Sequence, residues 1–178
     1  LDTGIEDAEL IAAELTDRYS SEVTPAVRDR VRGLIERDLI DAPDSVKAAA
    51  AESLRRWSDP RDCRTLVSCL DSESFAVRAA ATSALEFLVS RVPEAVETAL
   101  ASADLDGPGG ADIAQVLSRL GSDRAVDVLK RGLHAGDART RRAVVQALAM
   151  ANATDVAELI GYAIADEDID VQIAAVRT

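Results

Sequence analysis

Residues 77–85 read Val77-Arg78-Ala79-Ala80-Ala81-Thr82-Ser83-Ala84-Leu85, and related stretches recur along the chain. The leucines that correspond to Leu85 are Leu54, Leu117 and Leu148, so the steps along this series are 31, 32 and 31 residues. A second apolar series has steps of 31, 30, 33 and 31 residues and consists of Leu39, Leu70, Leu100, Leu133 and Ile164. Two independent series with one period predict an array of structural repeats.

Each repeat is predicted to be a pair of helices. In residues 77–88 the apolar side chains follow the i, i+3, i+4, i+7 spacing of one helix face, and residues 125–133 carry a second such stripe. Only 3% of the residues are aromatic while alanine is abundant, which favours closely packed helices over large sheets. Because neither helix can bury its stripe alone, neighbouring pairs are expected to stack into a one-dimensional core.

The recurring pattern resembles a known family. Val-Arg-x-Ala-Ala-x-x-Ala-Leu in residues 77–85, with a second helix that ends in Leu70-Asp71, is similar to HEAT repeats in the short form named after phycobilisome lyases. The resemblance implies an all-α, armadillo-type α-solenoid (superhelix) of about five HEAT-like helix-pair repeats. We therefore expect one repeat domain over residues 1–178, with 1–43 as a divergent first repeat and 44–178 as regular repeats, the last of them truncated.

The arginine of the signature has an implied role. Arg78 and Arg141 occupy this position, and Lys47 stands at the same place in an earlier repeat. In HEAT-like repeats this side chain typically forms an ion pair with an aspartate near the turn, and Asp71 and Asp137 are the candidates for that aspartate. The resemblance thus implies a ladder of ion pairs that ties the repeats together.

The charge of the chain narrows the classes of partner. Its 32 acidic and 20 basic residues give a formal net charge of −12, which disfavours contact with phosphate backbones. No nucleic-acid partner is therefore expected. All but two of the basic residues are arginine, a composition that resembles the proteins of salt-loving archaea, although a high-GC genome has a similar effect.

Several kinds of site are not expected from this sequence. Cys63 and Cys69 match neither a redox motif nor a zinc motif, so they are interpreted as core residues in a reducing, cytoplasmic compartment. With His134 as its single histidine, the chain cannot build a metal centre of several histidines. No run of 18 apolar residues occurs, so no membrane contact is expected within this fragment. We predict no catalytic residue, metal or cofactor.

The candidate binding surface lies on the second helices, which line the concave face in this class of repeat. The candidate residues are Arg64, Ser68, Glu94, Glu97, Asp127, Lys130, Arg131, Glu158 and Tyr162. Their mixed charges suit a mixed-charge protein segment. The alternative interpretation is a plain solvated face, because any amphipathic helix carries polar residues opposite its apolar stripe.

The third repeat departs from the pattern. It has Gly107, Gly109 and Gly110 where other repeats begin their first helix, and no nucleotide-binding motif surrounds them. We expect a delayed and shortened first helix, with a notch or hinge before it. The functional alternative is that this notch admits a partner chain close to the backbone.

Together these patterns favour a non-enzymatic scaffold that binds an unidentified protein partner on the concave face. One alternative is an enzyme or enzyme accessory that resembles the bilin lyases, although few aromatic residues are present to line a tetrapyrrole pocket. Another is a self-assembling array. The apolar residues of segment 171–176 begin a helix that no second helix follows, which leaves them available for self-association.

Overall fold

The chain is all-α wherever its structure is described. The computed structural model describes residues 26, 29, 33, 35–37, 42–151 and 156–178, and these contain helices and no strand. The helices are α3 (Asp44–Trp57), α4 (Asp62–Cys69), α5 (Phe75–Val89), α6 (Pro93–Leu100), α7 (Gly110–Leu120), α8 (Asp123–Gly132), α9 (Ala138–Met150), α10 (Val156–Ala163) and α11 (Ile169–Arg177). Most of the predicted divergent repeat, 1–43, lies outside the described residues.

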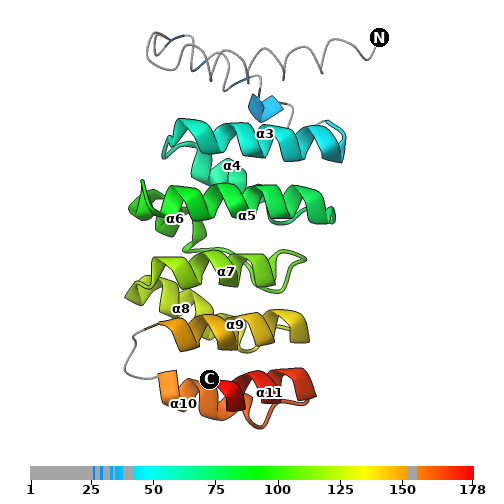
Figure 1. The fold of residues 1–178 in the computed structure, drawn as a ribbon, viewed down its shortest axis with the longest axis vertical. Helices are drawn as coiled ribbons and strands as arrows, with labels where there is room; N and C mark the ends of the chain where they lie inside the picture. The colour runs from blue at the N-terminus through cyan, green and yellow to red at the C-terminus, as the bar shows by residue number, and fades with distance from the viewer. Residues whose placement is uncertain (1–25, 27–28, 30–32, 34, 38–41, 152–155) are drawn as a thin grey trace.

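The helices form two layers along one axis (Figure 1). We call α3, α5, α7, α9 and α11 the first helices, and each of them packs against the next one in this order. The second helices lie behind them, where α4 packs against α6 and α6 against α8. Helix α10 packs against α9 and α11. This stack of helix pairs confirms the predicted α-solenoid.

The core runs along the stack through equivalent positions. Leu54, Leu85, Leu117 and Leu148 are each at most 1% exposed and occupy the same place in successive first helices. The residues of the second series lie at the ends of the second helices. Leu70 and Leu100 are fully buried, Leu133 is half-buried and Ile164 is 52% exposed. Leu39 lies outside the described residues. The buried leucines confirm the predicted period and its structural cause.

The arginine ladder exists, but the predicted partners were wrong. The Arg78 guanidinium binds Asp112 at 3.1 Å and donates to the carbonyl oxygens of Ser72 and Glu73. Arg141 likewise binds Asp166 at 2.9 Å and donates to the carbonyl oxygens of two residues before its own helix. Each arginine therefore closes the turn before its helix and reaches the following repeat.

The two aspartates that were expected to bind these arginines have other positions. Asp71 is exposed, whereas the Asp137 carboxylate accepts hydrogen bonds from the backbone N–H groups of Arg139 and Thr140 and so caps α9. Burial alone would raise the pKa of the Asp137 carboxyl, but these donors lower it below its ordinary value. An N-cap carboxylate is engaged by its own helix and is not available to a distant guanidinium.

The third repeat has the predicted late helix start. Helix α7 spans 11 residues, whereas α5 spans 15 and α9 spans 13. The preceding loop is packed: a Cβ at Gly109 would collide with the Leu70 carbonyl, and one at Gly110 with Leu105 and Thr140. Both glycines are buried against their own chain. The docking role of this notch stays a prediction. Only Gly107 is partly exposed.

Candidate functional site

The structure divides the predicted second-helix surface into separate parts. Arg64 and Glu94 lie in one hollow between α4 and α6, beside Thr98. Ser68 is exposed on α4, where its hydroxyl donates to the Thr65 carbonyl oxygen at 2.8 Å. A mixed-charge hollow of the predicted kind is therefore present at this end of the stack.

Two of the predicted residues hold the repeats together. Glu97 accepts a hydrogen bond from Ser122 and pairs with Arg124 at 3.5 Å, so it links α6 to the beginning of α8. Arg131 donates to the Ala101 carbonyl oxygen at 2.9 Å, which links the end of α8 back to the end of α6. The sequence could not show these contacts, because each joins residues 25 to 30 positions apart.

The remaining predicted residues lie toward the carboxyl end of the chain. Lys130 and Tyr162 line a second hollow between α8 and α10, together with His134 and the apolar Leu133 and Leu159. Asp127 lies 4.0 Å from Lys130 in the same helix. Glu158 is exposed on α10. The predicted binding role of this second-helix surface stays a prediction.

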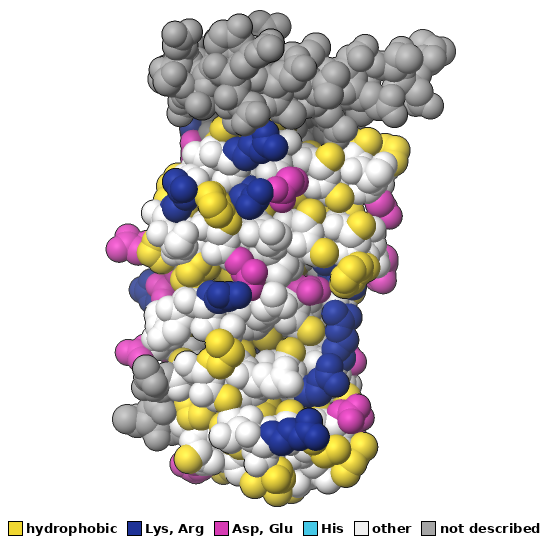
Figure 2. Space-filling model, in the orientation of Figure 1, with side chains coloured by type: hydrophobic (Ala, Val, Ile, Leu, Met, Phe, Trp, Pro, Cys, Tyr) yellow, Lys and Arg dark blue, Asp and Glu magenta, His cyan; other side chains and the backbone are white. Residues whose placement is uncertain are grey.

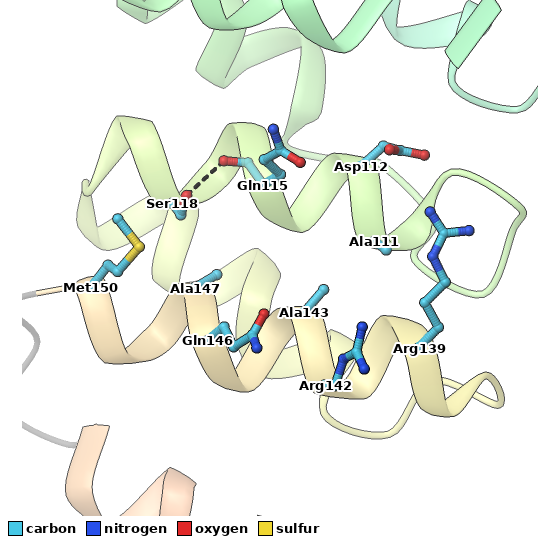
Figure 3. A pocket seen from close by; sticks show the side chains of 10 residues that line it. All are labelled: Ala111, Asp112, Gln115, Ser118, Arg139, Arg142, Ala143, Gln146, Ala147 and Met150. Atoms are coloured by element: carbon cyan, nitrogen blue, oxygen red, sulfur yellow. Dashed lines mark hydrogen bonds between the residues drawn. The ribbon is translucent and has the colours of Figure 1, made fainter. Parts of the chain in front are cut away.

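A groove that the sequence did not suggest lies on the opposite layer, between the first helices α7 and α9 (Figure 3). It has a volume of about 240 Å³. Its lining residues are Ala111, Asp112, Gln115, Ser118, Arg139, Arg142, Ala143, Gln146, Ala147 and Met150. We call it the α7/α9 groove.

Small side chains keep this groove open. Ala111 and Ser118 on α7 lie opposite Ala143 and Ala147 on α9, and none of these fills the space between the two helices (Figure 3). The helix axes can still approach closely because Leu117 and Leu148 are buried on the inner side. The groove is thus a consequence of alanine-rich helices that pack firmly through one face only.

Positive charge dominates the groove. Arg139 and Arg142 are exposed, and neither forms an ion pair with the described part of the chain. Figure 3 shows Arg139 reaching from α9 toward the beginning of α7, while Asp112 points away from α9. The Asp112 carboxylate is already bound by Arg78 on α5. Among the described residues, neither guanidinium group therefore forms an ion pair with an acidic side chain of the groove.

Two amides complete the polar lining. The Gln115 side-chain N–H donates to Glu86 at 3.0 Å, which leaves its carbonyl oxygen available. The Gln146 amide has no hydrogen bond within the described residues and faces the groove (Figure 3). An amide carries both donors and an acceptor, so it can bind the backbone of an added chain.

The α7/α9 groove continues onto the next helix. Arg142 and Gln146 also line a second, smaller groove of about 190 Å³ between α9 and α11. There they are joined by Asp170, Ile173 and Arg177. We call this the α9/α11 groove. Two residues shared by two adjacent grooves make one continuous polar strip across three first helices.

The charges of the molecule are segregated between its layers. The first helices contain nine basic residues and five acidic ones. The basic residues are Lys47, Arg55, Arg56, Arg78, Arg119, Arg139, Arg141, Arg142 and Arg177, and the acidic ones are Asp44, Glu52, Glu86, Asp112 and Asp170. Figure 2, which looks onto this layer, shows basic side chains following one another down one side over α9 and α11. A chain of formal charge −12 thus has one basic face.

A sequence signal for this face did exist. Arg139, Arg142 and Gln146 follow the i, i+3, i+7 spacing of one helix face, and Arg177 ends the next first helix. The binding surface was predicted on the second helices because these line the concave face in this class of repeat. A net charge taken over the whole chain does not reveal a local basic strip.

The two cysteines lie in the core, as predicted. Cys63 and Cys69 are free and buried, and burial raises the pKa of each thiol to about 11. His134 is exposed just after the end of α8. In the described part of the chain, no group of three or more His, Cys, Asp or Glu residues could hold a metal ion. None of the described helices is both long enough and apolar enough to cross a bilayer.

Comparison with known proteins confirms the class of repeat. Residues 31–110 match the family model for HEAT repeats, which confirms the predicted resemblance. No curated protein matches the chain in sequence.

Two solved structures are similar to this chain at low sequence identity. An engineered protein is 19% identical, with a TM-score of 0.53 over 99% of this chain and 90% of that one. The complex of CpcE and CpcF of phycocyanin lyase from Nostoc sp. PCC7120 is 17% identical, with a TM-score of 0.47 over 98% of this chain and 69% of that one. At this level of identity the first of these shows the helical repeat fold alone.

Proposed function

We propose that this chain is a non-enzymatic scaffold module that binds a protein partner on its first helices, in the α7/α9 groove. HEAT repeats generally mediate interactions between proteins, and the stack presents long surfaces for that purpose. One observation carries the choice of surface: Arg139 and Arg142 are exposed and unpaired beside a floor of small side chains and the free Gln146 amide. These groups suit a peptide segment that brings both carboxylates and backbone hydrogen bonds.

The chemistry of the groove supports a binding role over a catalytic one. Its two arginines offer N–H donors and no acceptor, so they cannot act as general bases. Asp112, the acidic residue of the lining, is held in an ion pair by Arg78. The two thiols are buried, and their raised pKa keeps them protonated at neutral pH. These side chains therefore support a binding role better than a catalytic one.

Site-specific photo-crosslinking tests the proposal. A photoreactive amino acid is placed at Gln146 in the α7/α9 groove and, in separate variants, at Thr98 and Tyr162 on the second helices. Each variant is used as bait in extract from the source cells. We expect a discrete crosslinked protein with the Gln146 variant that disappears when Arg142→Glu is added.

The matched variants decide between the two layers. Crosslinks at Thr98 or Tyr162, with none at Gln146, would place the partner on the second-helix surface and refute the proposed site. Crosslinks of equal yield at all three positions would indicate non-specific contact and count against the proposal as well. A thermal unfolding curve of each variant confirms that it is folded.

A further inference from the structure

We propose that the partner segment is acidic and extended, and that it lies across α7, α9 and α11 with its carboxylates against Arg139, Arg142 and Arg177. This inference rests on the proposed function, because it assigns the chemistry of the segment that the α7/α9 groove would bind. It adds the α9/α11 groove to the same site.

The continuity of the strip defines the path of the segment. Arg142 and Gln146 line both grooves, so a chain that leaves the α7/α9 groove over these residues enters the α9/α11 groove directly. The path crosses the first helices instead of following one of them. A segment that enters the grooves between three successive helices in this way is extended, because a helix with its side chains is about 10–12 Å wide and the axes of adjacent packed helices are only about 8–10 Å apart.

Charge complementarity defines the composition of the segment. Arg139, Arg142 and Arg177 are exposed and none forms an ion pair with the described residues. Of the two acidic residues that line the strip in the described part of the chain, Asp112 is bound to Arg78 and only Asp170 forms no ion pair there. The positive charges of two of the three arginines therefore have no matching carboxylate in the strip, although the molecule as a whole is acidic and repels anions. A carboxylate placed there gains a charge-assisted hydrogen bond.

The spacing of the acidic residues follows from helix packing. Arg142 and Arg177 lie on adjacent first helices, and the axes of packed helices are about 8–10 Å apart. An extended chain in the polyproline II conformation advances about 3.1 Å per residue and has three residues per turn, so carboxylates three positions apart lie on one side of the chain and match this interval. The expected partner motif thus has Asp or Glu at every third position, with small residues between them that fit over the alanines.

A protein segment fits the strip better than a nucleic acid. The residues that line the two grooves include no aromatic side chain on which a base could stack. The formal charge of −12 opposes the approach of a continuous phosphate backbone, whereas a short segment meets only the local basic strip. Single-stranded DNA is therefore the competing probe in the test.

Fluorescence anisotropy with designed peptides tests the inference. The probe is a labelled peptide of about 12 residues with Glu at every third position and Gly, Ser and Ala between, measured in about 0.1 M NaCl. Its control has Gln in place of every Glu. We expect the Glu peptide to bind at least about tenfold more tightly than the Gln peptide, the discrimination of one charge-assisted bond. Oligothymidylate of similar length is expected to bind more weakly than the Glu peptide.

Matched variants locate the binding. Arg142→Glu is expected to lower the affinity for the Glu peptide by at least about tenfold. Arg64→Glu, on the second-helix surface, is expected to change this affinity by less than about twofold. The triple variant Arg139→Glu, Arg142→Glu, Arg177→Glu should reverse the preference and bind a peptide with Lys in place of Glu. This reversal separates a specific strip from general attraction to an acidic peptide.

Each other outcome overturns the inference. If the Glu and Gln peptides bind equally, charge complementarity does not determine binding. If oligothymidylate binds more tightly than the Glu peptide, the strip binds nucleic acid and not an acidic protein segment. If Arg64→Glu and Arg142→Glu lower the affinity for the Glu peptide equally, the peptide does not bind specifically at the first-helix strip. A partner that crosslinks at Gln146 while the Glu peptide does not bind leaves the proposed function intact and refutes only the acidic segment.

Discussion

Two adjacent arginines of α9 have opposite environments. Arg141 is buried and bound to Asp166, whereas Arg142 is exposed and unpaired. We expect Arg141→Gln to lower the free energy of unfolding by about 3 kcal/mol, because it leaves carbonyl oxygens and the Asp166 carboxylate without their donor. Arg142→Gln is the control and should change it by less than about 0.5 kcal/mol. Denaturant unfolding of both variants checks this, and equal effects would contradict the assigned burial.

The same ion pair gives a dependence on pH. The hydrogen bond from Arg141 lowers the pKa of the Asp166 carboxyl below its ordinary value of 3.8. A group whose pKa is lowered by folding stabilises the protein above its unfolded pKa, and this stabilisation is lost as pH falls through the folded pKa. The difference in unfolding free energy between wild type and Arg141→Gln should therefore be constant from pH 7 to about pH 5 and shrink below about pH 4. A difference that grows on acidification would contradict this assignment.

Glycine 109 gives a second prediction at a single residue. A Cβ at Gly109 would collide with the Leu70 backbone carbonyl, and a carbonyl at the end of a packed helix cannot move aside easily. Gly109→Ala is expected to cost about 2 kcal/mol of stability, as overpacking does. The control is Gly107→Ala, whose added Cβ would lie 3.7 Å from the Asp71 carboxylate and should be tolerated. Thermal unfolding of the two variants measures the contrast.

The thiols offer a chemical test of the core. Because burial raises the pKa of Cys63 and Cys69 to about 11, almost no thiolate forms at pH 8. We expect a thiol reagent such as DTNB to react with the folded protein at least about a hundredfold more slowly than with protein in guanidinium chloride. Rapid labelling of either cysteine in the folded state would place it outside the core.

At the scale of the element, the first turn of α8 joins two repeats. Ser122 accepts a hydrogen bond from the Ala125 backbone N–H at 3.2 Å, and its hydroxyl donates to Glu97 on α6. Loss of an N-cap costs about 1 kcal/mol, so Ser122→Ala is expected to destabilise the protein by at least that amount. Ser68→Ala, which removes only a hydroxyl within α4, is the control. Chemical denaturation of both variants compares them, and a smaller effect at Ser122 would contradict this role.

The elements also show what sequence patterns can and cannot predict. The helix pairs and the two apolar series follow from periodicity, since a buried leucine such as Leu117 must recur wherever the core recurs. The partner of Arg78 was mispredicted because its guanidinium reaches Asp112, 34 residues away, and periodicity does not specify distant contacts. The α7/α9 groove escaped prediction for a similar reason, since it forms only when alanines of two separate helices face each other.

The whole molecule combines an acidic overall charge with one basic face. Asp and Glu are more frequent than Lys and Arg on the second helices and in most connecting turns, while the first helices contain an excess of arginine. A formal charge of −12 on a chain of 178 residues repels itself, and this repulsion lowers the stability of the folded state. The interactions that oppose it are buried ones, such as the ion pair of Arg141, and salt screens these much less than surface charges.

This charge distribution predicts opposite effects of salt on stability and on binding. Between about 0.1 and 1 M NaCl the Debye length falls from about 10 to about 3 Å, so the self-repulsion of the acidic surface is screened and the midpoint of thermal unfolding should rise. The same screening weakens attraction between the exposed arginines of the first helices and an acidic segment, so the affinity for the Glu peptide should fall over that range. Calorimetry and anisotropy on one preparation measure both. If stability falls together with affinity, the net charge does not oppose folding. If affinity is unchanged, the first-helix face does not bind through its arginines.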